Sequence, residues 1–101
     1  MVAHGISISQ SAIADFCRRN GIRRLSFFGS VLRDDFRPDS DIDVLVEFQP
    51  GKIVGWHIIT IEDELSYLLG GRKVDMVRKS ALNPRLKDRI LSSAEVQYEE
   101  G

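Results

Sequence analysis

The segment between residues 28 and 48 constrains this chain more than any other part of its sequence. A Gly29-Ser30 turn is followed, after ten residues, by Asp41 and Asp43 at the start of an apolar run. Because side chains alternate along a strand, the two aspartates are predicted to share one face, about 7 Å apart. Two like charges at this spacing repel, so a cation between them would be stabilising. The pattern predicts a phosphate-binding turn beside a metal site, although a solvated strand end, closed by Ser40 and Asp41, would explain any one residue alone.

The length and composition are typical of one small globular domain spanning residues 1–101. Apolar residues make up 43% of the chain and charged residues 29%, and no apolar run approaches the roughly 20 residues that cross a bilayer. The N-terminus lacks the basic and apolar segments of a secretory signal, so we expect a cytoplasmic protein. With 14 Lys and Arg against 15 Asp and Glu, the net charge of −1 gives no general attraction to nucleic acid or to membranes.

Hydrophobic periodicity and turn residues predict an α+β fold, a small mixed β-sheet flanked by helices. The first helix is expected to begin with Ser7 and Gln10 in capping-box spacing and to end at Asn20-Gly21. Cys17 falls on its apolar side, as a buried small hydrophobe. The remaining elements are expected as strands at 23–28, 41–48 and 72–78, helices at 55–69 and 84–92, a helical turn or two at 30–35, and a tail at 94–98 that is either an edge strand or irregular.

Two helices carry more specific expectations. The helix at 55–69 has an apolar face and an acidic stretch, residues 62–64, that should lie largely outside. The helix at 84–92 should begin at an Asn83 N-cap followed by Pro84, with Leu86 and Ile90 directed inward.

A third carboxylate is available to complete a metal site. Asp75 interrupts an apolar strand, and an ionised carboxylate in a buried strand is costly unless it is paired or coordinates a cation. An ion pair with Arg72, Lys73 or Arg78 is the alternative. Carboxylate oxygens without nearby His or Cys suit Mg²⁺, and two-metal sites place the ions about 3.5 to 4 Å apart for in-line displacement at phosphorus. We therefore expect Asp41, Asp43 and Asp75 to bind metal.

The turn before the aspartates has the features of a phosphate site. Gly29 allows a phosphate to approach the backbone, and Ser30 offers a hydroxyl and an amide at the start of a helical turn. Arg33, three residues later, lies on the same side of such a turn and could meet a triphosphate, or it could pair with Asp34 or Asp35.

Other chemistries have weaker support in the sequence. There is no Walker-type loop, and neither His4 nor His57 stands in a nucleophile motif. Basic residues gather in the last third of the chain, where they form either a solvated face or a contact for a polyanion or acidic partner: Arg72, Lys73, Arg78, Lys79, Arg85, Lys87 and Arg89.

These motifs resemble the MNT-type minimal nucleotidyltransferases of the DNA polymerase β superfamily. The resemblance rests on the stretches 28–33 and 37–48 and continues through 62–65, 71–77 and 84–91, covering roughly residues 22 to 99. It implies a nucleotidyltransferase (polymerase β-like) fold, in which Gly29 and Ser30 hold the triphosphate and Asp41 and Asp43 bind two metal ions. Asp75 would complete the catalytic metal site and help deprotonate the acceptor.

The resemblance also implies an activity and a partner. Such enzymes move a nucleoside monophosphate from a triphosphate to a hydroxyl and release pyrophosphate. Small members are typically antitoxins of HEPN-domain toxins, and some add AMP to a toxin tyrosine. The expected function is therefore Mg²⁺-dependent (or Mn²⁺-dependent) transfer of AMP from ATP to a HEPN toxin. The alternatives are stoichiometric masking of the toxin and transfer to a small molecule or nucleic acid. Many members have a small residue where this chain has Asp34, next to Arg33, so an extra negative charge lies near the triphosphate.

Overall fold

From the first helix onward, the main helices and strands follow the order expected from the sequence, and two short strands that were not predicted precede that helix. The computed structural model describes residues 2–3, 6–7, 9–29 and 41–100. The strands among them are β1 (Val2–Ala3), β2 (Ile6–Ser7), β3 (Ile22–Phe28), β4 (Ile42–Phe48), β5 (Val74–Arg78) and β6 (Glu95–Glu99). The helices are α1 (Gln10–Arg19), α2 (His57–Leu68), α3 (Pro84–Ser93) and the short 3₁₀ turn η2 (Lys79–Ala81). The predicted turn at 30–35 lies outside the described residues.

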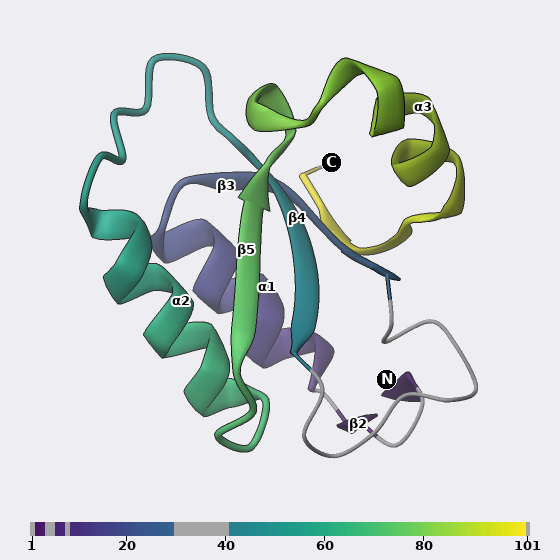
Figure 1. Cartoon of the computed structure of the whole chain (residues 1–101). Helices are drawn as coiled ribbons and strands as arrows, with labels where there is room; N and C mark the ends of the chain where they lie inside the picture. The colour runs from purple at the N-terminus through teal and green to yellow at the C-terminus, as the bar shows by residue number, and fades with distance from the viewer. Residues whose placement is uncertain (1, 4–5, 8, 30–40, 101) are drawn as a thin grey trace.

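The main sheet has four strands in the order β5-β4-β3-β6 (Figure 1). β3 is antiparallel to β4 and β6, whereas β4 and β5 are parallel. The expectation of a small mixed sheet is confirmed, and the tail of the chain forms an edge strand. β1 and β2 pair separately with each other.

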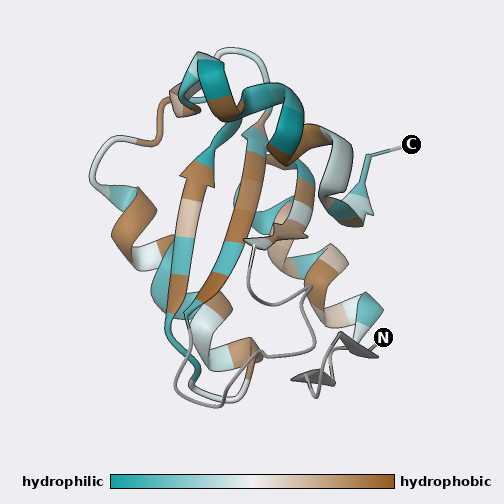
Figure 2. Cartoon of the chain, turned by 45° about the vertical axis from the view of Figure 1, so that its right-hand side comes forward, coloured by the Kyte–Doolittle hydropathy of each residue, from teal (hydrophilic) through white to brown (hydrophobic). Residues whose placement is uncertain are grey.

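One face of the sheet carries the hydrophobic core. Along β4, Ile42, Val44 and Val46 are fully buried, and Asp43 and Glu47 alternate with them and are half-buried. This alternation is visible as brown and teal bands on the strands in Figure 2. Helices α1 and α2 cover the core face, and both contribute buried residues to one cluster: Ile13, Phe16 and Cys17 from α1, and Ile61 and Leu65 from α2.

The first helix begins two residues later than the sequence suggested. The N-cap is Ser9, whose hydroxyl accepts a hydrogen bond from the Ala12 amide at 3.3 Å, whereas Ser7 belongs to β2. The predicted Ser7 cap is therefore wrong, because Ser9 has the extended backbone that an N-cap needs and Ser7 is committed to strand pairing. Cys17 is buried as expected, and burial raises the pKa of its thiol to about 12.

Helix α2 protects the open edge of the sheet. β5 is an edge strand, and the backbone N–H of Met76 donates to the Glu62 carboxylate at 2.8 Å. The hydroxyl of Ser66 donates to the Arg72 carbonyl at 2.5 Å, just before the strand. Glu62 was predicted to lie outside, but it is half-buried. It accepts the hydrogen bond of the Met76 N–H, which lies on the open edge of the sheet and has no neighbouring strand to pair with among the described residues.

The third helix packs more loosely than expected. Asn83 caps it as predicted, accepting from the Arg85 amide at 2.9 Å, but no residue of α3 is buried and Leu86 is 46% exposed. The inward direction predicted for Leu86 is wrong, because α3 lies beyond the end of β5 instead of over the core face (Figure 1). None of the helices in the described part of the chain is long and apolar enough to span a membrane.

Candidate active site

Two of the predicted metal-binding carboxylates are brought side by side by strand pairing. Asp43 in β4 is the direct register partner of Asp75 in β5. Neighbouring strands lie about 4.8 Å apart, and paired residues of a parallel ladder share a face. The two carboxylates, 32 residues apart in sequence, therefore stand together on the face of the sheet opposite α1 and α2.

Asp75 lies in an exposed edge strand and not in a buried one. The sequence placed it in a buried strand, but β5 is an edge strand and Asp75 is exposed, between buried Val74 and Met76. Because the Asp75 carboxylate is exposed to solvent, it does not need a charged partner or a cation to offset a cost of burial. The alternative also fails, because no ion pair joins Asp75 to Arg72, Lys73 or Arg78 within the described residues. Its place beside Asp43 is what supports a role for Asp75.

Gly29 lies directly against Asp43 at the end of β3. Phe28 is the register partner of Asp43, and Gly29 follows it with a φ of 73°, in the left-handed region that favours glycine. A Cβ on Gly29 would lie 3.1 Å from Asp43 Cγ and would overlap one carboxylate oxygen. Because Gly29 has no side chain, the Asp43 carboxylate can occupy this space.

Asp41 lies at the entrance to the same strand. β4 begins at Ile42, whose N–H donates to the Lys73 carbonyl at 2.8 Å and ties the two strand starts together. The Lys73 ammonium lies 3.8 Å from the Asp41 carboxylate, and the two side chains are 80% and 44% exposed. The sequence allowed Lys73 as a partner of Asp75 or as part of a basic surface. The parallel register of β4 and β5 places Lys73 beside Asp41 instead.

The chemistry of these side chains fits a hard divalent cation. Asp41, Asp43 and Asp75 offer only carboxylate oxygens, which Mg²⁺ and Mn²⁺ prefer, and the missing side chain of Gly29 leaves room for the Asp43 carboxylate. Within the described residues, no group of three His, Cys, Asp or Glu side chains is close enough to hold a metal ion. Asp43 and Asp75 thus form a neighbouring pair, and Asp41 lies at the start of the same strand as Asp43. Lys73 would compete with a metal ion for the Asp41 carboxylate.

The other predicted nucleotide-binding residues cannot be placed. Ser30 and Arg33, with Asp34 and Asp35, lie outside the described residues.

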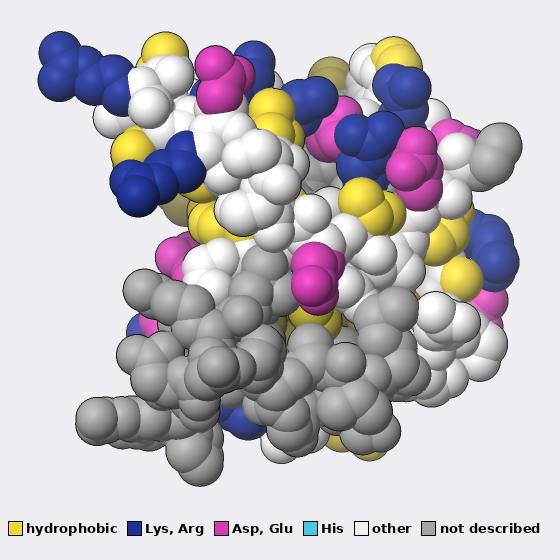
Figure 3. Space-filling view, turned by 90° about the vertical axis from the view of Figure 1, so that its right-hand side faces the viewer, with side chains coloured by type: hydrophobic (Ala, Val, Ile, Leu, Met, Phe, Trp, Pro, Cys, Tyr) yellow, Lys and Arg dark blue, Asp and Glu magenta, His cyan; other side chains and the backbone are white. Residues whose placement is uncertain are grey.

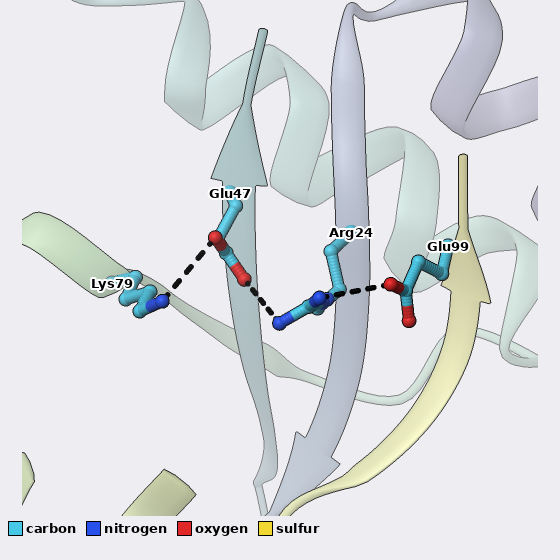
Figure 4. Close-up of polar contacts among 4 residues, drawn as sticks. All are labelled: Arg24, Glu47, Lys79 and Glu99. Carbon is cyan, nitrogen blue, oxygen red and sulfur yellow. Dashed lines mark hydrogen bonds and ion pairs between the residues drawn. The ribbon is translucent and has the colours of Figure 1, made fainter. Parts of the chain in front are cut away.

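A row of ion pairs, which no sequence pattern predicted, crosses the same sheet further along. Arg24 contacts Glu47 at 3.2 Å and Glu99 at 2.9 Å, and Lys79 contacts Glu47 at 3.5 Å (Figure 4). The hydrogen bond to Glu99 and the charge of Glu47 raise the pKa of the Arg24 guanidinium above its ordinary value. These residues come from four separate elements, so only strand register could have identified the row.

Comparison with known proteins identifies the family. The family model described as "Nucleotidyltransferase domain" matches residues 10–96, which include the Gly29, Asp43 and Asp75 site. The chain belongs to the nucleotidyltransferase domain family. This nucleotidyltransferase is 39% identical over 75 residues to the protein adenylyltransferase MntA of Thermococcus cleftensis, and the match covers 72% of each chain. It is therefore of the minimal, MNT type.

Solved structures share the fold of this minimal nucleotidyltransferase. A toxin–antitoxin crystal structure with AMP-PNP aligns with a TM-score of 0.73 at 18% identity, covering 92% of this chain and 75% of the other. An MNT antitoxin in complex with a tri-AMPylated HEPN toxin of Shewanella oneidensis aligns with a TM-score of 0.64 at 18% identity, covering 90% and 70%. The predicted polymerase β-like nucleotidyltransferase fold is confirmed.

Proposed function

We propose that this nucleotidyltransferase is an antitoxin that transfers AMP from ATP to a HEPN-type toxin. The acceptor is the hydroxyl group of a tyrosine side chain in that toxin. The observation that carries the proposal is the register pairing of Asp43 with Asp75 beside Gly29. The 39% identical relative is named a protein adenylyltransferase, and two proteins of this fold are found with toxins, one with an ATP analogue and one with an AMPylated toxin. These likenesses support ATP as the donor and a HEPN protein as the acceptor.

The reaction is a displacement at the α-phosphorus of ATP. The acceptor hydroxyl oxygen forms a bond to the α-phosphorus, the bond from that phosphorus to the bridging oxygen breaks, and pyrophosphate leaves with the bonding electrons. Asp75 is exposed at the sheet edge, where it would meet an acceptor arriving from solvent and take its proton. Gly29 lets a triphosphate approach the backbone, with Ser30 and Arg33 as its further contacts.

Divalent cations are part of the proposal. Asp41, Asp43 and Asp75 would hold two Mg²⁺ ions, with Mn²⁺ as a substitute, and bound metal would stabilise charge on the phosphates. Because Lys73 contacts Asp41 at 3.8 Å, metal binding would release this lysine from its ion pair.

The test uses a HEPN-type protein as acceptor, taken from the adjacent reading frame if that frame encodes one. Wild-type protein incubated with α-labelled ATP and Mg²⁺ should label the toxin, and the Asp41→Asn/Asp43→Asn variant or added EDTA should abolish labelling. Mass spectrometry of the toxin identifies the modified residue. If no label appears and the variant behaves as wild type, the transfer proposal fails.

Stoichiometric masking of the toxin is the competing function. It predicts that the Asp41→Asn/Asp43→Asn variant still neutralises the toxin, in proportion to the amount bound and without dependence on time. Neutralisation that grows with time and needs both aspartates excludes it. Labelling of a small molecule or nucleic acid in the absence of toxin would point to a different acceptor.

A further inference from the structure

A basic pocket lies at the far end of the two strands that carry the candidate active site. It has a volume of about 600 Å³ and is lined by the ends of β4 and β5, the 49–52 turn, Val54, the start of η2 and one residue of α3. Asp43 pairs with Asp75 near the start of these strands, and Val46 pairs with Arg78 three residues later. At about 3.3 Å per residue, the pocket begins roughly 10 Å from the paired carboxylates. None of Gly29, Asp43 and Asp75 lines it.

The charge of this pocket is strongly positive although the chain as a whole is slightly negative. Its lining includes four cationic side chains and a single carboxylate: Lys52, Arg78, Lys79 and Lys87 against Glu47. Glu47 is already neutralised by Arg24 and Lys79 in the ion-pair row of Figure 4. No described carboxylate pairs with Lys52, Arg78 or Lys87.

The three cations without a described carboxylate partner come from three separate parts of the chain. Lys52 follows the turn after β4, Arg78 ends β5, and Lys87 lies on α3. Figure 3 shows Lys and Arg side chains gathered over the α3 end of the molecule. Three cations that have no carboxylate partner among the described residues repel one another around this hollow, and a bound anion would remove that repulsion.

The size and walls of the pocket favour an organic phosphate over a simple ion. Ligand sites commonly enclose about 300 to 1,000 Å³, and a lone phosphate would leave most of a 600 Å³ pocket empty. Val46, Phe48 and Val54 supply apolar surface beside the cations, as a base or sugar would need. Arginine and lysine together are well suited to phosphate oxygens.

We propose that this pocket is a second ligand site, separate from the transfer site, that binds a phosphate-bearing molecule of nucleotide size. The proposal does not rest on the transfer reaction, because binding can be measured without metal or acceptor. In EDTA the carboxylates of the transfer site repel an anionic ligand, whereas the basic pocket keeps its charge. The phosphate could be that of a free nucleotide or one already attached to an acceptor.

The experiment is a titration of the whole chain with AMP in EDTA, followed by the amide signals of a ¹H–¹⁵N NMR spectrum. We expect saturable shifts for residues 47–52 and 78–80, and little change at Gly29 and Asp43. The Arg78→Gln/Lys87→Gln variant should bind at least about tenfold more weakly, because hydrogen bonds from charged groups are lost. The matched control, Arg85→Gln/Arg89→Gln, removes the same net charge from α3 outside the pocket and should change affinity less than about twofold, since screening weakens distant charges.

Several outcomes would overturn the proposal. Shifts confined to the region of Gly29 and Asp43 would assign AMP to the transfer site alone. Equal weakening in both double variants would reduce the effect to net charge. If inorganic phosphate binds as tightly as AMP, the pocket does not recognise the nucleoside part of the ligand. If a hexaglutamate peptide binds as tightly as AMP, an acidic protein segment is the favoured ligand. Tighter binding of AMP-modified tyrosine than of AMP would support the site and identify the modified acceptor as its source.

Discussion

Replacing Gly29 with alanine tests the geometry of the candidate site most directly. Gly29 has a φ of 73°, and an alanine held in this left-handed region costs about 1 to 2 kcal/mol. For a chain of this size, such a loss lowers the melting temperature by roughly 5 to 15 °C. The new methyl group would also overlap the Asp43 carboxylate. Asp43 must then move by roughly an ångström to recover ordinary carbon–oxygen contacts of about 3.3 to 3.6 Å.

Displacing Asp43 should cost activity well beyond the loss of stability. A misplacement of about 1 Å in a catalytic geometry can cost about 100-fold in rate. We therefore expect Gly29→Ala to lower kcat/KM for AMP transfer by about 100-fold, or about 2.7 kcal/mol of transition-state stabilisation. Initial rates with α-labelled ATP and the toxin measure this loss. Mn²⁺ binding measures the same displacement without the acceptor, and it should weaken in the variant.

Gly51 provides the matched control. Its φ is 80°, close to that of Gly29, but no atom lies within 4 Å of a Cβ built on it. Gly51→Ala should therefore lose similar stability in urea denaturation and keep wild-type transfer and Mn²⁺ binding. The reasoning is refuted if the two variants, compared at a temperature where both are folded, transfer AMP at the same rate.

Three further changes test contacts elsewhere in the fold. Glu62→Ala should lower the free energy of unfolding by about 1 to 3 kcal/mol in urea denaturation, because the Met76 N–H loses its acceptor, whereas Glu62→Gln should recover most of the loss. Lys73→Gln should tighten Mn²⁺ binding several-fold in an isothermal titration, since Asp41 loses its competing cation, with less than about 1 kcal/mol of change in stability because the pair is exposed. Unchanged Mn²⁺ affinity would argue against Asp41 as a ligand. Burial raises the pKa of Cys17 from 9.0 to about 12, so the folded state holds its proton more tightly and this stabilisation is present below pH 9 and lost as the pH rises toward 12. The unfolding free energy of wild type minus that of Cys17→Ala should be flat below pH 9 and fall above it by up to about 1.4 kcal/mol per pH unit, and a flat difference through pH 11 would contradict this.

The elements were largely predictable because their signals are local. The aspartate-led apolar run predicts β4, and the Asn83-Pro84 pair predicts the start of α3. Errors arose where two local signals competed or where packing decided. Capping-box spacing predicted Ser7 as the helix cap, but Ser7 belongs to β2 and Ser9 caps the helix. Leu86 fits an apolar stripe on α3, but the helix lies past the sheet and leaves it half exposed.

The sequence by itself determined which residues could do chemistry, because Gly29, Asp41, Asp43 and Asp75 carry their properties wherever they are placed. Only the tertiary structure decided which of them meet. The parallel register of β4 and β5, fixed by burying alternate apolar residues on the core face, sets Asp43 beside Asp75, since a slip of one residue would turn one carboxylate into the core. The same register places Lys73 beside Asp41 and brings Arg78, which lines the basic pocket, next to Val46. Such pairings join residues tens of positions apart, and no local pattern in the chain specifies them.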